Sequence, residues 1–247
     1  MFVDARGDAG PPVLLLHGGG VGGWMWQPLA AELRRPLRLL VPDLPGHGRS
    51  AATPYVSHAQ ALEALTTLLR ARGEPVAVVG FSLGAQLAVL LAATAPELVS
   101  RVLVVSAQAK PVPFVGLTLA LLDLTLPLAR RRWFSRLQAR ELFIPDALFD
   151  VWFETSAAMT RESLRAAVGE NLRFTVPPGW ARFPGPALVL AGEREAGLMK
   201  RSAALLQRAL PGSGLEYFPE CGHGIPLQQP ARFARRLERW LDDGAAL

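Results

Sequence analysis

Residues 75–84 read Pro-Val-Ala-Val-Val-Gly-Phe-Ser-Leu-Gly. The apolar run 75–79 predicts a buried strand, and the apolar pattern over 86–95 predicts a helix after it. Between them stands G-x-S-x-G, with Ser82 at its centre. On a sharp strand-to-helix turn, a serine sits in strained backbone space with its hydroxyl exposed, and flanking glycines keep side chains out of the corner. We therefore expect Ser82 to be a nucleophile and not an idle residue of a glycine-rich turn.

A second glycine-rich loop, His-Gly-Gly-Gly at 17–20, follows the apolar run 13–16. Glycines are needed where the backbone itself must approach a substrate carbonyl. The loop fits neither G-x-G-x-x-G nor G-x-x-x-x-G-K-[ST], which argues against a phosphate-binding loop. We expect the backbone N–H groups of Gly19 and Leu83, the residue after the serine, to form an oxyanion hole.

A histidine between two glycines follows the strand-like run 215–218, in the sequence Cys-Gly-His-Gly at 221–224. Packing explains such a residue poorly, whereas imidazole is the usual general base for a serine. His223 is therefore the candidate base. Structural roles are expected for the other histidines, which are His17 in the glycine loop, His47 in a turn and His58 at an exposed helix start.

Two glutamates compete for the acidic position after the apolar run 187–191, where the chain reads Gly192-Glu-Arg-Glu. A carboxylate just past this strand would reach the far ring nitrogen of the histidine and hold its tautomer. Glu195 stands in the Gly-x-x-acid position and ranks first. Glu193 remains the alternative, with local pairing to an arginine as its expected role. The order along the chain is then serine, acid, histidine.

These motifs, with Asp-Leu-Pro-Gly-His-Gly-Arg-Ser at 43–50, resemble the α/β-hydrolase fold superfamily, and among its members the esterase- and lipase-like serine hydrolases with a helical cap. The resemblance covers nearly the whole chain and is weakest at 108–180. It implies ester hydrolysis through an acyl-enzyme, with no cofactor. Glu195 departs from the aspartate that most relatives carry, and the N-terminal part that precedes the first turn is short.

Other chemistries on this fold bear on the assignment. Epoxide hydrolases and haloalkane dehalogenases of this fold use an aspartate nucleophile, which Ser82 argues against. Carbon–carbon bond hydrolases and cofactor-free perhydrolases keep the same three side chains, so both remain alternatives. A ligand sensor that turns over slowly or not at all is the alternative from another functional class.

The strand-like runs alternate with helical ones, which predicts an α/β fold with a mostly parallel, doubly wound sheet and a shortened N-terminal edge. These runs are 13–16, 37–41, 76–79, 102–105, 187–191 and 215–218. With 247 residues, half of them hydrophobic, the chain can bury the core of one such domain. We expect residues 1–107 and 181–247 to form this core and residues 108–180 to form a helical cap.

The predicted cap is rich in aromatic and leucine side chains, which favours a small hydrophobic, ester-like substrate. Trp24 and Trp26, just past the glycine loop, could face the same pocket. The expected substrate-binding residues are Trp24, Trp26, Phe114, Leu117, Leu121, Trp152 and Phe153.

The net charge of +5 comes mainly from arginines that are spread through the predicted helices, without the basic stripe and interleaved aromatics of a nucleic-acid binder. One cluster, Arg-Arg-Arg-Trp at 130–133, follows the apolar stretch 112–129. Apolar residues beside Arg and Trp are typical of interfacial helices. Prolines and an aspartate interrupt the stretch, which argues against a membrane span. A cap helix is favoured, and contact with a membrane surface is the less favoured alternative. The oligomeric state is not indicated.

The single cysteine, Cys221, excludes an internal disulfide. A cysteine nucleophile is disfavoured, because the G-x-S-x-G motif carries serine. No cluster of His, Cys and carboxylates has metal-ligand spacing, so we expect neither a metal nor a cofactor. Residues 1–10 are polar and glycine-rich, with no signal-peptide pattern, so the expected location is the cytoplasm.

Overall fold

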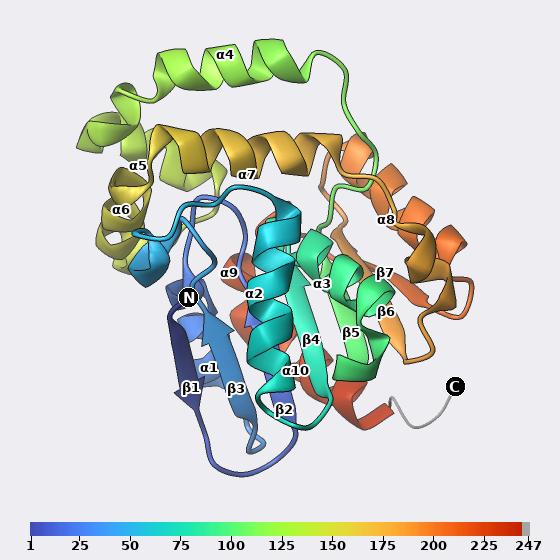
Figure 1. The fold of residues 1–247 in the computed structure, drawn as a ribbon. Helices are drawn as coiled ribbons and strands as arrows, with labels where there is room; N and C mark the ends of the chain where they lie inside the picture. Colours follow the sequence, from blue (N-terminus) through green and yellow to red (C-terminus); the bar gives the residue numbers. More distant parts are fainter. Residues whose placement is uncertain (244–247) are drawn as a thin grey trace.

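The protein is described by a computed structural model that covers residues 1–243. Its centre is a seven-stranded sheet in the order β1-β3-β2-β4-β5-β6-β7 (Figure 1). The strands are β1 (Val3–Arg6), β2 (Pro12–Leu16), β3 (Arg38–Pro42), β4 (Val76–Phe81), β5 (Val99–Val105), β6 (Ala187–Gly192) and β7 (Gly214–Phe218). β1 pairs antiparallel with β3, and the remaining pairs are parallel. The predicted α/β class and mostly parallel sheet are confirmed.

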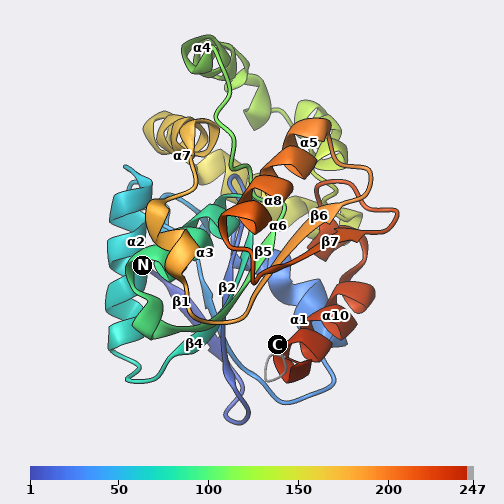
Figure 2. The same ribbon diagram turned by 90° about the vertical axis from the view of Figure 1, so that its right-hand side faces the viewer.

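Helices cover both faces of the sheet, as Figures 1 and 2 show. On one face lie α2 (His58–Arg70), α3 (Leu83–Thr94) and α8 (Gly197–Ala209), and on the other lie α1 (Gln27–Glu32), α9 (Ile225–Gln228) and α10 (Pro230–Asp243). Successive strand residues enter different cores: Leu14 and Val78 pack towards α2 and α3, whereas Leu15 and Val79 pack towards α1 and α10. Strands buried on both faces explain why these runs are apolar throughout instead of alternating.

The leading edge of the sheet is short, as expected. A single antiparallel strand, β1, precedes β2, and the sequence had not predicted it as a strand. The helix after Ser82 begins at Leu83.

The chain leaves the sheet after β5 and rejoins it at β6. This segment holds α4 (Val115–Thr125), α5 (Arg132–Glu141), α6 (Phe149–Ala158) and α7 (Arg161–Arg173). In Figures 1 and 2 these helices lie beyond one end of the sheet, with α4 outermost. We use the word cap for residues 108–180. Among residues 1–243, no helix combines the length and the apolar character needed to cross a bilayer.

Candidate active site

Ser82 lies on the turn between β4 and α3, with φ 52° and ψ −112°. A non-glycine residue with positive φ is strained, so the surrounding structure must hold it. The two motif glycines make this turn sterically feasible. A Cβ on Gly80 would lie 2.3 Å from the carbonyl oxygen of Gly84, and a Cβ on Gly84 would lie 2.3 Å from that of Leu16. The strand–turn–helix geometry predicted for the motif is therefore present.

The structure brings Ser82 together with His223 and Glu195. The Ser82 Oγ lies 3.1 Å from His223 Nε2, and His223 Nδ1 lies 2.6 Å from Glu195 Oε1. The glutamate side chain is 1% exposed, whereas the imidazole is 36% exposed. With the Nδ1 proton directed at the carboxylate, Nε2 is free to accept the serine proton.

Glu195 is held by further donors on its second oxygen. Oε2 accepts hydrogen bonds from the backbone N–H of Gly192 at 2.7 Å and from the hydroxyl of Ser106 at 3.2 Å. Ser106 directly follows β5 with φ 55°, another strained non-glycine residue. Glu193 points elsewhere, where its Oε2 accepts from the N–H of Glu220 on the surface. Of the two glutamates, only Glu195 contacts the histidine.

Ser106 was missed by sequence reasoning. A lone serine at the carboxyl end of an apolar strand belongs to no motif. Its one signal is that position, because the carboxyl ends of parallel strands meet at the same edge of the sheet.

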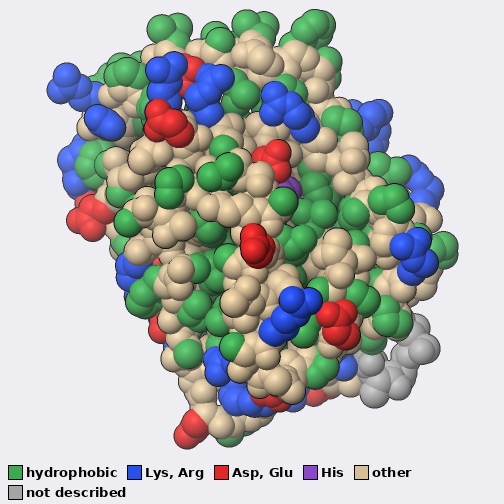
Figure 3. Space-filling view, in the orientation of Figure 1, with side chains coloured by type: hydrophobic (Ala, Val, Ile, Leu, Met, Phe, Trp, Pro, Cys, Tyr) green, Lys and Arg blue, Asp and Glu red, His purple; other side chains and the backbone are tan. Residues whose placement is uncertain are grey.

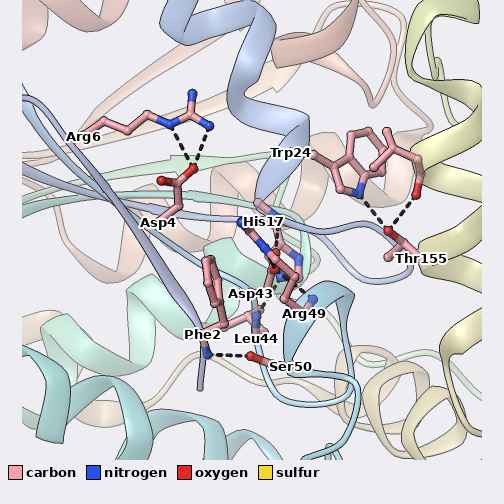
Figure 4. Close-up of polar contacts among 12 residues, drawn as sticks. Phe2, Asp4, Arg6, His17, Trp24, Asp43, Leu44, Arg49, Ser50 and Thr155 are labelled. Carbon is pink, nitrogen blue, oxygen red and sulfur yellow. Dashed lines mark hydrogen bonds and ion pairs between the residues drawn. The ribbon is translucent and has the colours of Figure 1, made fainter.

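A buried network fixes the glycine loop at 17–20, and Figure 4 shows the contact of His17 with Leu44 and the contacts of Asp43. The N–H of Leu44 donates to His17 Nε2 at 2.9 Å, so the Nδ1 proton donates to the carbonyl oxygen of Gly18 at 2.7 Å. Burial lowers the pKa of His17, which favours this neutral form. Asp43 anchors the next turn by accepting from the N–H of Gly23 at 2.7 Å.

Gly19 and Leu83 line the same cavity as Ser82. Leu83 is the first residue of α3. The first amides of a helix have no intrahelical acceptor, and they carry the positive end of the helix dipole. The arrangement therefore suits the negative oxygen that both N–H groups are expected to hold.

The remaining histidines have structural roles, as predicted, but His58 is not exposed. It is 6% exposed, and its ring accepts from the Tyr55 hydroxyl and donates to the Gln86 amide oxygen, at 2.7 and 2.9 Å. The start of α2 is buried because α7 covers it, with Glu170 accepting from the N–H of His58. Burial also lowers the pKa of His58, and it lowers that of His47 to about 3.

A cavity of about 350 Å³ opens beside Ser82 and extends under the cap. Its wall contains apolar side chains and a few neutral polar ones, and no charged side chain. The lining residues are Gly19, Gly20, Ser82, Leu83, Leu122, Thr125, Leu126, Ala129, Gln138, Leu142, Trp152, Ser156, Leu164, Ala167, Val168, Asn171 and Leu172. Of the substrate-binding residues expected from the sequence, Trp152 is in this wall.

The structure places the other expected substrate-binding residues away from this wall. Phe114, Leu117 and Leu121 are 79%, 63% and 55% exposed, on the outer side of α4 and at its start. Trp26 stacks on Phe233 in the core, and Phe153 stacks on Phe149. Trp24 lines a different cavity, where its Nε1–H donates to Thr155 Oγ1 at 3.0 Å (Figure 4). Because α4 is apolar on all sides, its pattern could not show which face turns inward.

The glycines beside His223 make room for a cap residue. A Cβ on Gly222 would lie 2.9 Å from the ring of Phe143, and a Cβ on Gly224 would lie 2.7 Å from the Cβ of Phe143. Phe143 follows α5 with φ 58°. The cap therefore contacts the histidine loop directly.

Among residues 1–243, no group of three or more His, Cys, Asp and Glu side chains could hold a metal ion. Cys221 is buried, and burial raises the pKa of its thiol, which makes the thiolate needed for nucleophilic attack less accessible.

The comparisons with known proteins agree with this geometry. A family profile described as "Alpha/beta hydrolase family" matches residues 13–236. The chain is 29% identical to a pimeloyl-[acyl-carrier protein] methyl ester esterase of Chromobacterium violaceum, with 99% of each chain covered. It is also 29% identical to an uncharacterized protein of Mycobacterium tuberculosis, over 95% of this chain and 76% of that one.

Solved structures with the same fold include an enol-lactonase from Burkholderia xenovorans LB400 and an esterase from Exiguobacterium antarcticum. The first has a TM-score of 0.82 at 18% identity, covering 98% of this chain and 96% of that chain. The second has a TM-score of 0.81 at 19% identity, covering 98% and 95%. At these identities the likeness shows the fold. The profile match over most of the chain, together with this fold, shows that the protein belongs to the α/β-hydrolase family.

Proposed function

We propose that the protein is a serine carboxylesterase, which cleaves an ester with an uncharged, largely apolar acyl group through an acyl-enzyme. The observation that carries this proposal is the connected series Ser82–His223–Glu195, with contacts of 3.1 and 2.6 Å, whose serine lines a cavity without charged side chains.

In the proposed reaction, His223 accepts the proton of Ser82 as the serine oxygen attacks the ester carbonyl. The N–H groups of Gly19 and Leu83 hold the oxyanion, and Glu195 stabilises the imidazolium. The imidazolium then gives its proton to the departing alkoxide. Water, activated by the same histidine, hydrolyses the acyl-enzyme and restores the serine. The first proton transfer is between Ser82 and His223, whose side chains contact each other in the structure.

The cavity wall supports an uncharged acyl group. Leucines from α4 and α7, among them Leu122, Leu126 and Leu164, would remove apolar surface from water on binding. An ionised group would have to lose its hydration without a charged partner there, which is unfavourable. The relative that is named a methyl ester esterase supports an ester as the bond that is cleaved.

The test combines covalent labelling with turnover. A fluorophosphonate probe should label the folded protein at Ser82, and p-nitrophenyl esters from acetate to dodecanoate should be hydrolysed. Labelling with no turnover of any ester would replace the proposal with one of its alternatives, a carbon–carbon bond hydrolase, a perhydrolase or a ligand sensor. Absence of labelling would exclude a serine mechanism altogether.

A further inference from the structure

The inner contacts of α4 fix which face of this helix points outwards. Leu119 is buried, with a methyl group 3.6 Å from where a Cβ on Gly169 of α7 would lie. Asp123 forms ion pairs with Arg161 and Arg165 of α7. These contacts lie on one side of the helix, so the opposite side faces solvent.

That outer side carries a row of large apolar side chains. Of the twelve large hydrophobic residues that are exposed within residues 1–243, eight lie at 114–142, and one of these, Leu142, also lines the cavity beside Ser82. Five of them follow a spacing of three and four residues, which places them on one face: Phe114, Leu117, Leu121, Leu124 and Leu128. Soluble monomers rarely expose contiguous apolar patches of this kind unless they bind something. Figure 3 shows hydrophobic side chains along the upper edge of the molecule, over α4.

Basic side chains continue this surface into α5. Residues 114–142 contain five arginines (Arg130, Arg131, Arg132, Arg136 and Arg140) against two carboxylates (Asp123 and Glu141), a net charge of +3. Asp123 is directed inwards at α7, and Arg132 forms an ion pair with Asp150 of α6, so the positive charge of this surface comes from Arg130, Arg131, Arg136 and Arg140. Trp133 begins the same helix and is 62% exposed. Exposed leucines with flanking arginines and a tryptophan match the composition of helices that lie in a membrane interface.

We propose that the outer face of α4 and α5, which we call the docking face, binds the surface of an anionic phospholipid bilayer. A second copy of the chain fits this face poorly, because a two-fold interface would set this basic face against an identical basic face. An anionic bilayer offers both a negative surface and an apolar interior within one helix diameter. The docking does not depend on the proposed esterase activity.

Docking would also set the distance between the cavity and the lipid. The inner side of α4 contributes Leu122, Thr125 and Leu126 to the wall beside Ser82, so a docked protein holds this cavity one helix away from the lipid.

Vesicle flotation of the full-length Ser82→Ala protein tests the docking without lipid hydrolysis. Phosphatidylcholine vesicles that contain phosphatidylglycerol should carry the protein upwards at low salt and release it at high salt, while pure phosphatidylcholine should carry much less. The charge variant is Arg130→Gln/Arg131→Gln/Arg140→Gln. It should bind the anionic vesicles more weakly by about fivefold for each arginine removed. The apolar variant Leu124→Gln/Trp133→Gln should lower binding about tenfold or more.

Matched controls remove the same groups from the core domain. Arg70→Gln/Arg208→Gln/Arg235→Gln and Val56→Gln/Tyr217→Gln change exposed residues outside the docking face and should bind like the parent. Equal binding to both vesicle types, or equal losses in the control variants, would overturn the proposal. So would a dimer in light scattering that the docking-face variants dissociate, because the face would then bind a second copy.

Hydrolysis of a water-soluble p-nitrophenyl ester, measured with Ser82 restored, separates this proposal from the esterase proposal. The charge variant should keep that activity and bind the anionic vesicles more weakly. A protein that binds vesicles but hydrolyses no ester would retain the docking proposal and refute the esterase.

Discussion

The carboxyl edge of the sheet and the cap differ in how their side chains are held. At the sheet edge, each polar group has a defined partner: Glu195 uses both oxygens, and the two serines at the ends of β4 and β5 keep strained backbones. In the cap, apolar side chains line a cavity on one side and meet solvent on the other, and few polar contacts select among them. In the proposed function, the sheet edge carries the chemistry and the cap selects the substrate that is held there.

The two regions should therefore tolerate amino-acid substitutions differently. At the edge, loss of a single side-chain oxygen or nitrogen would interrupt the proposed proton transfer. Effects on kcat should therefore be large and depend on which atom is replaced. In the cap, contacts are numerous and individually small, so effects should be graded and depend on volume.

The largest expected effect belongs to Ser82→Ala. Without the nucleophile, only the residual rate from the oxyanion hole and from binding remains, so kcat should fall by about 10⁴- to 10⁶-fold and fluorophosphonate labelling should vanish. Ser202→Ala is the matched control, because its hydroxyl is buried without a partner among the described residues. A folded Ser82→Ala protein with undiminished turnover would move the chemistry away from the sheet edge.

Next in size is the comparison of Glu195→Gln with Glu193→Gln. An amide next to His223 Nδ1 can hold the imidazole in the wrong tautomer, so the Glu195 change should lower kcat by about 10³- to 10⁴-fold. The Glu193 change should alter kcat little, because this side chain bonds the Glu220 backbone on the surface. Measured kcat values in the reverse order would assign the acid to Glu193.

Acid should destabilise the core through its buried histidines. Burial lowers the pKa of His17, His47 and His58 in the folded state, so between pH 7.5 and 5.5 the unfolded chain binds protons that the folded chain does not. Stability therefore rises with pH and is lost as pH falls through about 6.5, by up to about 1.4 kcal/mol for each histidine over that interval. Urea unfolding followed by tryptophan fluorescence measures this loss.

His47→Asn provides the control for this pH dependence. It removes the group whose pKa is lowered to about 3, so the loss between the two pH values should shrink by one histidine's share. An unfolding free energy that stays constant from pH 7.5 to 5.5 would contradict the burial argument. The cap contains no histidine and should contribute nothing in this range.

The smallest expected effects are those of acyl-chain length on kcat/KM. Each methylene buried against the cap should raise kcat/KM by up to about fourfold until the cavity is full, after which it should fall. Leu126→Trp narrows the cavity and should move the optimum to shorter esters, while Leu117→Trp, on the exposed side, should leave it in place. A profile that falls steadily from acetate upwards would mean that the cap leucines have no role in substrate choice. A shift caused by Leu117→Trp would restore the assignment made from the sequence.

The sheet-edge residues could be located from sequence because the backbone dictates them. A strand–turn–helix with glycines at both flanks leaves one place for Ser82, and packing does not explain a glycine-flanked His223. Glu195 was ranked above Glu193 by its spacing from Gly192, and the geometry agrees with that order. Ser106 could not be found, because its role depends on a partner 89 residues away.

Cap residues were harder to assign for a physical reason. α4 is apolar around its whole circumference, so periodicity could not distinguish Leu122, which lines the cavity, from Leu121, which faces solvent. His58 was expected at the surface because helix starts usually are, but α7 folds over it. Both errors arise from tertiary contacts that no local pattern encodes.

Phe143 links these two regions by direct contact. Its ring fills the space that the glycines at 222 and 224 leave open around His223. A change in the length or course of the cap would displace this ring, and a side chain at either glycine would push against it. We therefore expect the loop at 221–224 and the end of α5 to evolve together. A chimera that takes its cap from a relative should keep its activity only when it also inherits the matching histidine loop.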